Sequence, residues 1–302
     1  MRDSLTLNQE LRDAIDREIA ARTKMHQAQV ARFKAVKSSL LAAGAPAAPA
    51  ALAPLALLAH GDSWFDYPLA GNAVSFSDTD IIAQLGWMGT VNPLILNVAH
   101  YGDATTEEMS LPKQQRMIDA LQDSDNWTTN AKPDAILFSG GGDDIAGNQF
   151  CIYLNYAMPG ASGLNDARFK GALASVEASY QDLFAFRDRY AAGVPIFGHC
   201  YDFAIPNGTN PGCAGPWLKP SLDYCGWNVA QGTQIVRQAL LELKALLLRF
   251  AGDPANNFIL VDTQGTLAPA DWANELHPYP DGFKALAAKF VTALRTKFPN
   301  RI

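Results

Sequence analysis

The chain has no surplus of basic residues: 24 Lys and Arg stand against 30 Asp and Glu, which gives a formal charge of −6. Because little positive charge is available to neutralise phosphates, we expect no nucleic acid partner. Cysteine is also scarce, and its four positions contain no CxxC pair, which argues against a structural zinc site. Cys213 and Cys225 lie in one Gly/Pro-rich stretch, where they form either a local disulfide or two free thiols.

The sequence also lacks leader-like and membrane-spanning runs. Acidic residues interrupt the first turns and no apolar segment follows them, so we expect no signal peptide and favour a cytoplasmic location. The uncharged stretch 38–59 carries Pro46, Pro49 and Pro54 and is richer in Ala than in Leu or Ile, so we expect no transmembrane segment. With 48% hydrophobic and 18% charged residues, the chain has enough apolar side chains for a sizeable core, which excludes wholesale disorder.

The first pattern that is present is an amphipathic helix predicted over residues 4–41. Apolar residues recur every four positions from Leu7 to Ile19, and charged residues fill the other faces. A linker rich in Ala and Pro follows this helix. We therefore divide the chain into a helical extension with its linker, residues 1–50, and a main domain, residues 51–302. The helix is expected either to pack on that domain or to join copies of the chain into a homo-oligomer.

From residue 54 onward, strand patterns alternate with helix patterns. The predicted strands are 55–59, 94–98, 135–138, 195–197 and 258–261, and the predicted helices are 79–85 (capped by Ser77 or Asp78), 105–121, 169–190, 227–250 and 282–297. This alternation implies a parallel sheet covered by helices on both faces. Two long irregular stretches, 147–166 and 201–226, are expected to form walls of a binding cleft.

Chemically suggestive residues follow several of these strands, in chain order. The first strand ends in Gly61-Asp62-Ser63, and a Ser on such a turn carries a hydroxyl that a base can reach. The later blocks are Asn97 to Asp103, Gly141-Gly142-Asp143-Asp144, and Asn274-Glu275-Leu276-His277. Because loops at the carboxyl ends of parallel strands form the site in such a sheet, these blocks are expected to meet. His60, His100 and His199 also sit at strand exits, where we interpret them as hydrogen-bonded wall residues.

This ordered set resembles the SGNH hydrolases, also called the GDSL esterase/lipase family, over roughly residues 54–298. The resemblance implies a three-layer α/β/α, flavodoxin-like fold with a five-stranded parallel sheet, and hydrolysis of esters. It implies that Ser63 is the nucleophile and His277 the general base, and that the Ser63 and Gly102 N–H groups hold the oxyanion. The chain has no Gly-x-Ser-x-Gly elbow, which separates it from the α/β-hydrolases.

Two positions depart from the family pattern. Asp143 stands where the family has an oxyanion-binding Asn, and an ionised carboxylate cannot donate a hydrogen bond. Asp143 either serves in protonated form, since burial and Asp144 raise a carboxyl pKa, or lies aside. Asn274 stands where the family has the Asp that orients the base. The orienting group is then the Asn274 side chain, its backbone carbonyl, or the carboxylate of Asp271 or Glu275.

The function predicted from these residues is a serine esterase that acts on a small or lipid-like carboxylic ester. Trp64 and Trp217 are expected to line its substrate cleft. No organic cofactor and no metal are expected, since no His-rich ligand set accompanies the acidic residues. One alternative is a weakened or non-catalytic binding protein on a hydrolase fold, which the departures at Asp143 and Asn274 favour. A third reading is metal-dependent phosphodiester hydrolysis.

Overall fold

A computed structural model of the protein describes residues 4–43, 53–68, 79–129, 131–209 and 215–302. Five parallel strands form one sheet, in the order β2-β1-β3-β4-β5. The strands are β1 Ala56–Gly61, β2 Leu94–Asn97, β3 Ala135–Ser139, β4 Ile196–His199 and β5 Phe258–Val261. Every residue of β1, β3 and β4 is buried, as expected for strands covered on both faces. The strand order is the flavodoxin-like one, so the predicted fold class is confirmed.

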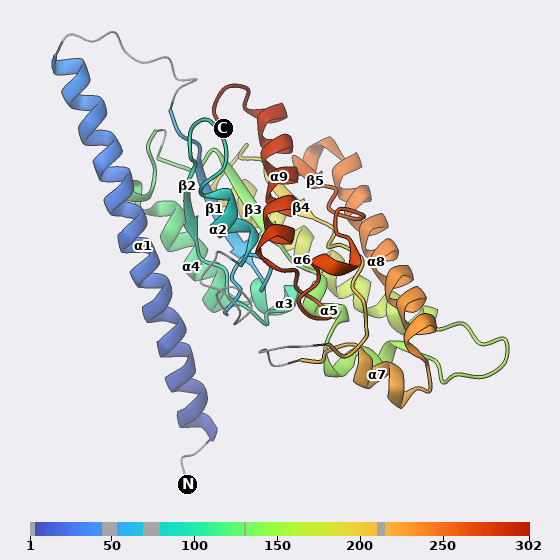
Figure 1. The fold of residues 1–302 in the computed structure, drawn as a ribbon. Coiled ribbons are helices and arrows are strands. Elements are labelled where there is room, and N and C mark those ends of the chain that lie inside the picture. Colours follow the sequence, from blue (N-terminus) through green and yellow to red (C-terminus); the bar gives the residue numbers. More distant parts are fainter. Residues whose placement is uncertain (1–3, 44–52, 69–78, 130, 210–214) are drawn as a thin grey trace.

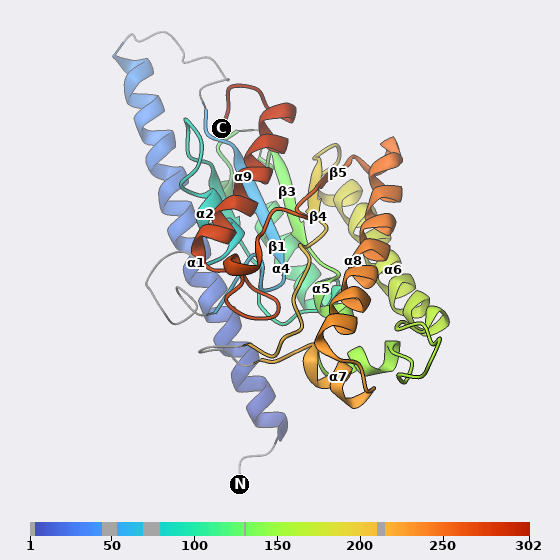
Figure 2. The same cartoon turned by 45° about the vertical axis from the view of Figure 1, so that its right-hand side comes forward.

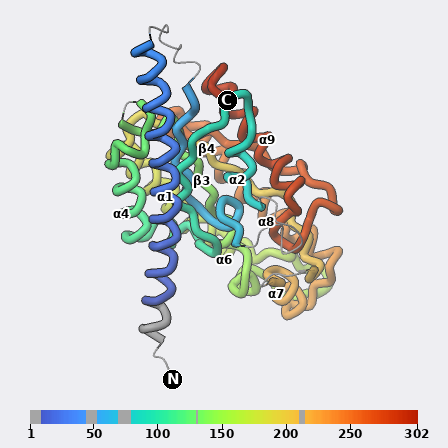
Figure 3. Tube along the Cα trace, turned by 60° about the vertical axis from the view of Figure 1, so that its left-hand side comes forward, coloured from blue at the N-terminus to red at the C-terminus, as the bar shows by residue number. Residues whose placement is uncertain are grey.

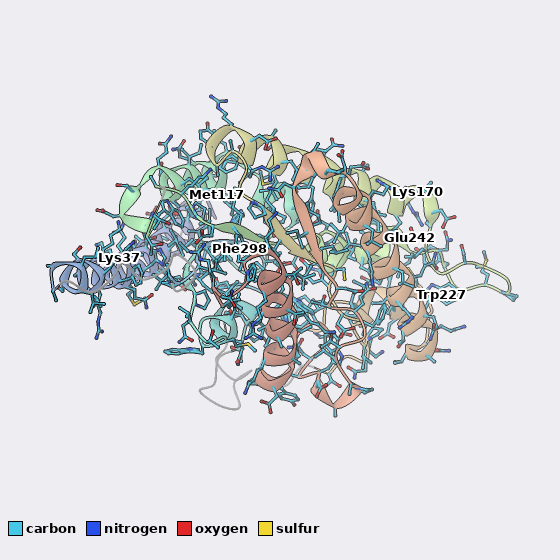
Figure 4. All side chains as sticks on the ribbon, turned by 90° about the horizontal axis from the view of Figure 1, so that it is seen from above. Lys37, Met117, Lys170, Trp227, Glu242 and Phe298 are labelled. Carbon is cyan, nitrogen blue, oxygen red and sulfur yellow. The ribbon has the colours of Figure 1, made fainter. Side chains whose placement is uncertain are left out.

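Helices cover both faces of this sheet (Figures 1 and 2). The main helices of the domain are α2 Ile81–Leu85, α3 Thr105–Glu108, α4 Leu111–Gln122, α6 Asp166–Tyr190, α8 Val229–Gly252 and α9 Pro280–Lys297. α2 and α9 pack together on one face, while α4, α6 and α8 lie on the other. Side chains fill the space between the sheet and the helices on each face, and Met117 of α4 is fully buried there (Figure 4). Lys37 and Lys170, in contrast, extend into solvent.

The N-terminal helix α1 Ser4–Ala42 runs along the β2 end of the sheet (Figures 1 and 3). Ile19 and Val30 are buried against the domain, and His26 Nε2 lies 2.8 Å from the carbonyl oxygen of Asn126. Arg22 reaches the loops that follow β1 and β2. The helix was expected either to pack on the domain or to join copies of the chain, and in the structure it packs on the domain. Self-association through the helix and the division at residue 50 stay predictions, because the linker lies outside the described residues.

Two predicted helices differ from the structure. The helix predicted over 105–121 is divided into α3 and α4, since Pro112 lies in the first turn of α4, where its missing N–H costs no helical bond. α2 begins after Asp80, whose carboxylate accepts a hydrogen bond from the Ala83 N–H at 2.6 Å. Asp80 therefore takes the capping position assigned to Ser77 or Asp78, which lie outside the described residues.

The two long irregular stretches contain short helices. The first includes the 3₁₀ helix η4 Asn148–Tyr153, and the second includes α7 Lys219–Tyr224, which packs beside it. Another short helix, α5 Gly142–Ile145, begins directly after β3 and was not predicted. Cys225 is a buried free thiol, while Cys213 is outside the described residues. In the described part of the chain, every helix is too short or too polar to cross a membrane.

Candidate active site

The candidate site lies at the carboxyl ends of β1 and β3, where the strand order reverses and open parallel sheets form a crevice. Ser63 follows β1 in a turn that packs tightly against β3. Gly61 has a φ of 146°, and a Cβ at this position would lie 2.3 Å from the Ser139 carbonyl oxygen. Only glycine fits this approach, which explains the Gly that precedes Asp62-Ser63.

Ser63 and His277 are brought into direct contact. Ser63 Oγ lies 2.7 Å from His277 Nε2, although 214 residues separate them in sequence. On the other side of the ring, His277 Nδ1 lies 3.2 Å from Asn274 Oδ1. The same oxygen accepts the backbone N–H groups of Leu276 at 2.9 Å and His277 at 2.8 Å. These two donors identify the atom that faces the ring as the amide oxygen, an acceptor.

This network fixes the tautomer of His277. Nδ1 carries the proton and donates it to Asn274 Oδ1, so Nε2 is left as an acceptor for the Ser63 hydroxyl. Asp271 and Glu275, the other residues considered for this role, are engaged elsewhere. The Asp271 carboxylate accepts from the Ala268 N–H at 2.7 Å, and Glu275 binds a different loop. Of the alternatives, the Asn274 side chain is the group in contact with the ring.

His277 is deeply buried, which lowers its pKa from 6.5 to about 3. The rings of Tyr67 and Trp217 lie 4.4 Å and 5.6 Å from it, measured between centroids. The neutral form is therefore maintained over the physiological pH range, and the ring is ready to accept a proton. The protonated ring, the imidazolium, is poorly stabilised in this site, because the amide of Asn274 offers it a dipole but no negative charge.

A second buried hydrogen-bond network, centred on the Asp62 carboxylate, holds the turn that carries Ser63. The Asp62 carboxylate accepts the Trp64 N–H at 3.0 Å, the Ser139 hydroxyl at 2.6 Å and the hydroxyl of Tyr201. Ser139 Oγ in turn lies 2.8 Å from His199 Nε2. Burial raises the pKa of Asp62 to about 6, while these hydrogen bonds oppose the rise. Burial also keeps His199 neutral, with a pKa of about 3, so it acts here as a hydrogen-bonding wall residue.

Asp143 lies in α5 and lines the same pocket as Ser63 and His277. Its Oδ2 is inaccessible to solvent and has no hydrogen-bond partner among the described residues. Burial, followed by the negative charges of Asp62 and Asp144, raises its pKa well above 3.8. The protonated form is thereby favoured, and a protonated carboxyl can donate a hydrogen bond.

Of the remaining predicted site residues, two tryptophans lie at the pocket or against His277, whereas Gly102 does not line the pocket. Trp64 lines the pocket, and Trp217 packs edge-on against His277. Gly102 lies in an exposed turn with a φ of 80° and is not among the described residues that line the pocket. Its role in an oxyanion hole stays a prediction. No three His, Cys, Asp or Glu side chains group as metal ligands in the described part of the chain.

The pocket contains about 440 Å³ of space when its open mouth is included. Most of its lining is apolar and includes side chains from α5, from α8 and from Leu218, which directly precedes α7. The apolar lining residues are Trp64, Ile145, Ala146, Ala204, Leu218, Val236, Leu240 and Leu276. The site thus joins a paired hydroxyl and imidazole to an apolar cavity.

Comparison with known proteins gives matches at the level of structure. No protein-family model matches the chain, and no curated protein matches it. The lipase Lip_vut3 from a goat rumen metagenome is 15% identical, with a TM-score of 0.52 over 79% of this chain and 97% of its own. An extracellular lipase from Streptomyces rimosus is 17% identical, with a TM-score of 0.51 over 78% of this chain and 98% of its own. The chain has the SGNH hydrolase fold.

Several residues of this SGNH-fold site gave no clear signal in the sequence. Val236 and Leu240 belong to the apolar face of α8, and their spacing is equally typical of a helix packed in the core. Tyr201 and Ser139 meet Asp62 only through the fold, since 139 and 77 residues separate them from it. Their position directly after β4 and at the end of β3 is the one hint that the sequence offers.

Proposed function

We propose that the protein is a serine esterase that hydrolyses carboxylic esters. The observation that carries the proposal is the 2.7 Å contact between Ser63 Oγ and His277 Nε2, with the opposite ring nitrogen held by Asn274. This is the geometry of a nucleophile activated by an oriented base. The SGNH fold, shared with two lipases at low identity, supports the same chemistry but does not by itself determine it.

In the proposed reaction, Ser63 Oγ attacks the ester carbonyl carbon while its proton passes to His277 Nε2. The carbonyl oxygen becomes an oxyanion, which the Ser63 N–H, the Gly102 N–H and the protonated Asp143 carboxyl would stabilise as donors. The tetrahedral intermediate then expels the alcohol, which takes the proton from His277 and leaves an acyl group on Ser63. Water deprotonated by His277 attacks this acyl group, and the acid and free Ser63 are released.

The lining of the pocket favours an ester with an apolar acyl or aryl group. Its wall of Leu, Val and Ile side chains offers apolar contact but few groups able to bind a row of sugar hydroxyls. Asp143 in neutral form adds no charge to this surface. We therefore place the acyl group of the substrate against Leu240 and Val236, with the alcohol directed toward the mouth.

Steady-state hydrolysis of short p-nitrophenyl esters tests the proposal. Ser63→Ala should reduce kcat by about 10⁴ or more, with an unchanged thermal midpoint. Ser175→Ala, on the exposed side of α6, is the matched control and should retain full activity. If Ser63→Ala keeps the wild-type rate, Ser63 is not the nucleophile. If the wild-type protein hydrolyses no ester, a binding protein on this fold becomes the better account.

A further inference from the structure

Glu275 lies two residues before His277 and is completely buried. Its carboxylate accepts four backbone N–H groups, all from the stretch 201–226. Oε1 binds Gly208 at 3.1 Å and Lys219 at 3.0 Å, and Oε2 binds Trp217 at 2.6 Å and Leu218 at 2.9 Å. An ionised carboxylate has about four acceptor positions, so this one is fully used. Such charge-assisted bonds are about twice as strong as neutral ones.

The segment held by Glu275 forms part of the site. Trp217 packs its ring edge-on against His277, with 5.6 Å between the centroids. Leu218, the next residue, lines the pocket. Both backbone N–H groups are bound to the same Glu275 oxygen, so one atom fixes the two residues together.

The backbone that carries Glu275 is just as firmly tied to His277. The carbonyl oxygen of His277 accepts the N–H groups of Ala273 at 3.0 Å and Asn274 at 3.2 Å. Glu275 therefore sits inside the tight turn that presents the imidazole. A displacement of its side chain would alter the distance between the turn and the Trp217 segment.

We propose that Glu275 is a positioning residue that holds the Trp217–Leu218 segment against His277, which keeps the imidazole dry and sets the size of the acyl pocket. This role rests on the proposed esterase function for its effect on substrates. Its effect on the imidazole itself does not, because the protonation of His277 can be measured without any substrate.

The surroundings of the ring make this readout specific. Ser63, Asn274 and Trp217 contact it without formal charge, and Tyr67 contributes a phenol ring. Asp143 lines the same pocket and is neutral when protonated. Burial is the cause of the low pKa of His277, so water admitted at the Trp217 side should raise it.

The test is an NMR titration of His277 in the full-length protein, combined with ester kinetics. Glu275→Gln replaces one acceptor oxygen by an NH₂ group that faces backbone donors. We expect the pKa of His277 to rise by about one pH unit or more. The ratio of kcat/KM for octanoate to that for acetate p-nitrophenyl esters should change by about tenfold. Glu275→Asp, which keeps the charge, should restore part of both properties.

The matched control is Asp253→Asn, which alters an exposed carboxylate that accepts the Ala255 N–H at 2.9 Å before β5, at the opposite end of the sheet. It should leave the His277 titration and the ester ratio unchanged. If Glu275→Gln does not fold, Trp217→Leu must give the same rise in the His277 pKa. A folded Glu275→Gln or Trp217→Leu protein with a wild-type His277 titration overturns the proposal. An inactive wild-type protein whose His277 titration still responds would instead refute the esterase function alone.

Discussion

The side-chain oxygen of Asn274 lies 3.2 Å from Nδ1 of His277, where it orients the ring without supplying a negative charge. A base arranged in this way has the correct tautomer before reaction, but its protonated form is poorly stabilised. Burial lowers the pKa of His277 to about 3, and Asn274 supplies no charge that would offset this effect. The pH dependence of the reaction should therefore report this pair of residues.

Asn274→Asp should change that dependence in a defined direction. A carboxylate beside Nδ1 stabilises the imidazolium, so the pKa of His277 rises from its low value. His277 acts as a base only at pH values above its pKa, so the acid limb of the kcat–pH profile should shift to higher pH. The plateau above it should rise by about tenfold or more, since the transition state contains the imidazolium.

Asn274→Ala is the companion variant, because it removes the oxygen that accepts from the ring and two backbone N–H groups. Its plateau should fall by about 10²-fold as the ring loses its orientation. Identical limbs and plateaus in the wild type and Asn274→Asp would mean that position 274 does not govern the base.

Asp143 should produce an alkaline limb in the same profile. Burial and neighbouring negative charges raise its pKa well above 3.8, so it donates a hydrogen bond until the pH passes that raised value. Above it, the ionised carboxylate would repel the oxyanion and the rate should fall. Asp143→Asn keeps a donor at every pH, so kcat should hold at alkaline pH. Asp143→Ala should lower kcat by about 10²–10³-fold at pH values below that raised pKa, where the wild-type carboxyl is a donor. An alkaline limb that persists in Asp143→Asn belongs to another group.

Glu108 should make the stability of the protein depend on pH. It is fully buried, and neither carboxyl oxygen has a partner among the described residues. Burial and the charge of Asp62 raise its pKa well above 4.5, so the folded state binds a proton that the unfolded state releases. Stability is therefore lost as pH rises from about 4.5 toward that raised pKa, by up to about 1.4 kcal/mol per pH unit.

Glu108→Gln removes this titration. The thermal midpoint of the variant, relative to that of the wild type, should therefore increase as the pH rises from 5 to 8. Thermal denaturation followed by circular dichroism measures the difference. Glu107→Gln, at the exposed neighbouring position, should show no such trend. A constant difference between Glu108→Gln and the wild type at all pH values would show that Glu108 does not bind the extra proton.

Arg22 should connect α1 to the stability of the domain. Its guanidinium donates to Asp66 Oδ1 at 2.6 Å and to the Ala99 carbonyl oxygen at 3.2 Å. Arg22→Met leaves the buried Asp66 without its cation and should lower the free energy of unfolding by about 1–3 kcal/mol. Arg12→Met, on an exposed face of the same helix, provides the comparison in a urea titration. Equal midpoints for the two variants would mean that the ion pair contributes nothing measurable.

The architecture was accessible from the sequence because its signals are local. Apolar runs such as Leu55 to Ala59, separated by helical patterns, already imply a parallel sheet, and the structure supplies the strand order. Short blocks at strand exits also point to Ser63 and His277 as the candidate nucleophile and base. Their contact across 214 residues could only be inferred through the resemblance to SGNH hydrolases.

Features that depend on distant partners were less accessible. The sequence left open which group orients His277, because the direction of one side-chain oxygen decides it. It gave no sign that Glu275 binds backbone groups 56 to 67 residues away. The division of the 105–121 helix, in contrast, has a local cause in Pro112, which the sequence itself contains.

The most direct test of the proposed esterase is covalent labelling with a fluorophosphonate probe, followed by peptide mass spectrometry. The probe reacts with an activated serine, so the account predicts one adduct, on Ser63. His277→Ala should slow its formation by several orders of magnitude, because the base is lost. Folded wild-type protein in which Ser63 remains unmodified, or in which a different residue carries the adduct, would contradict the account.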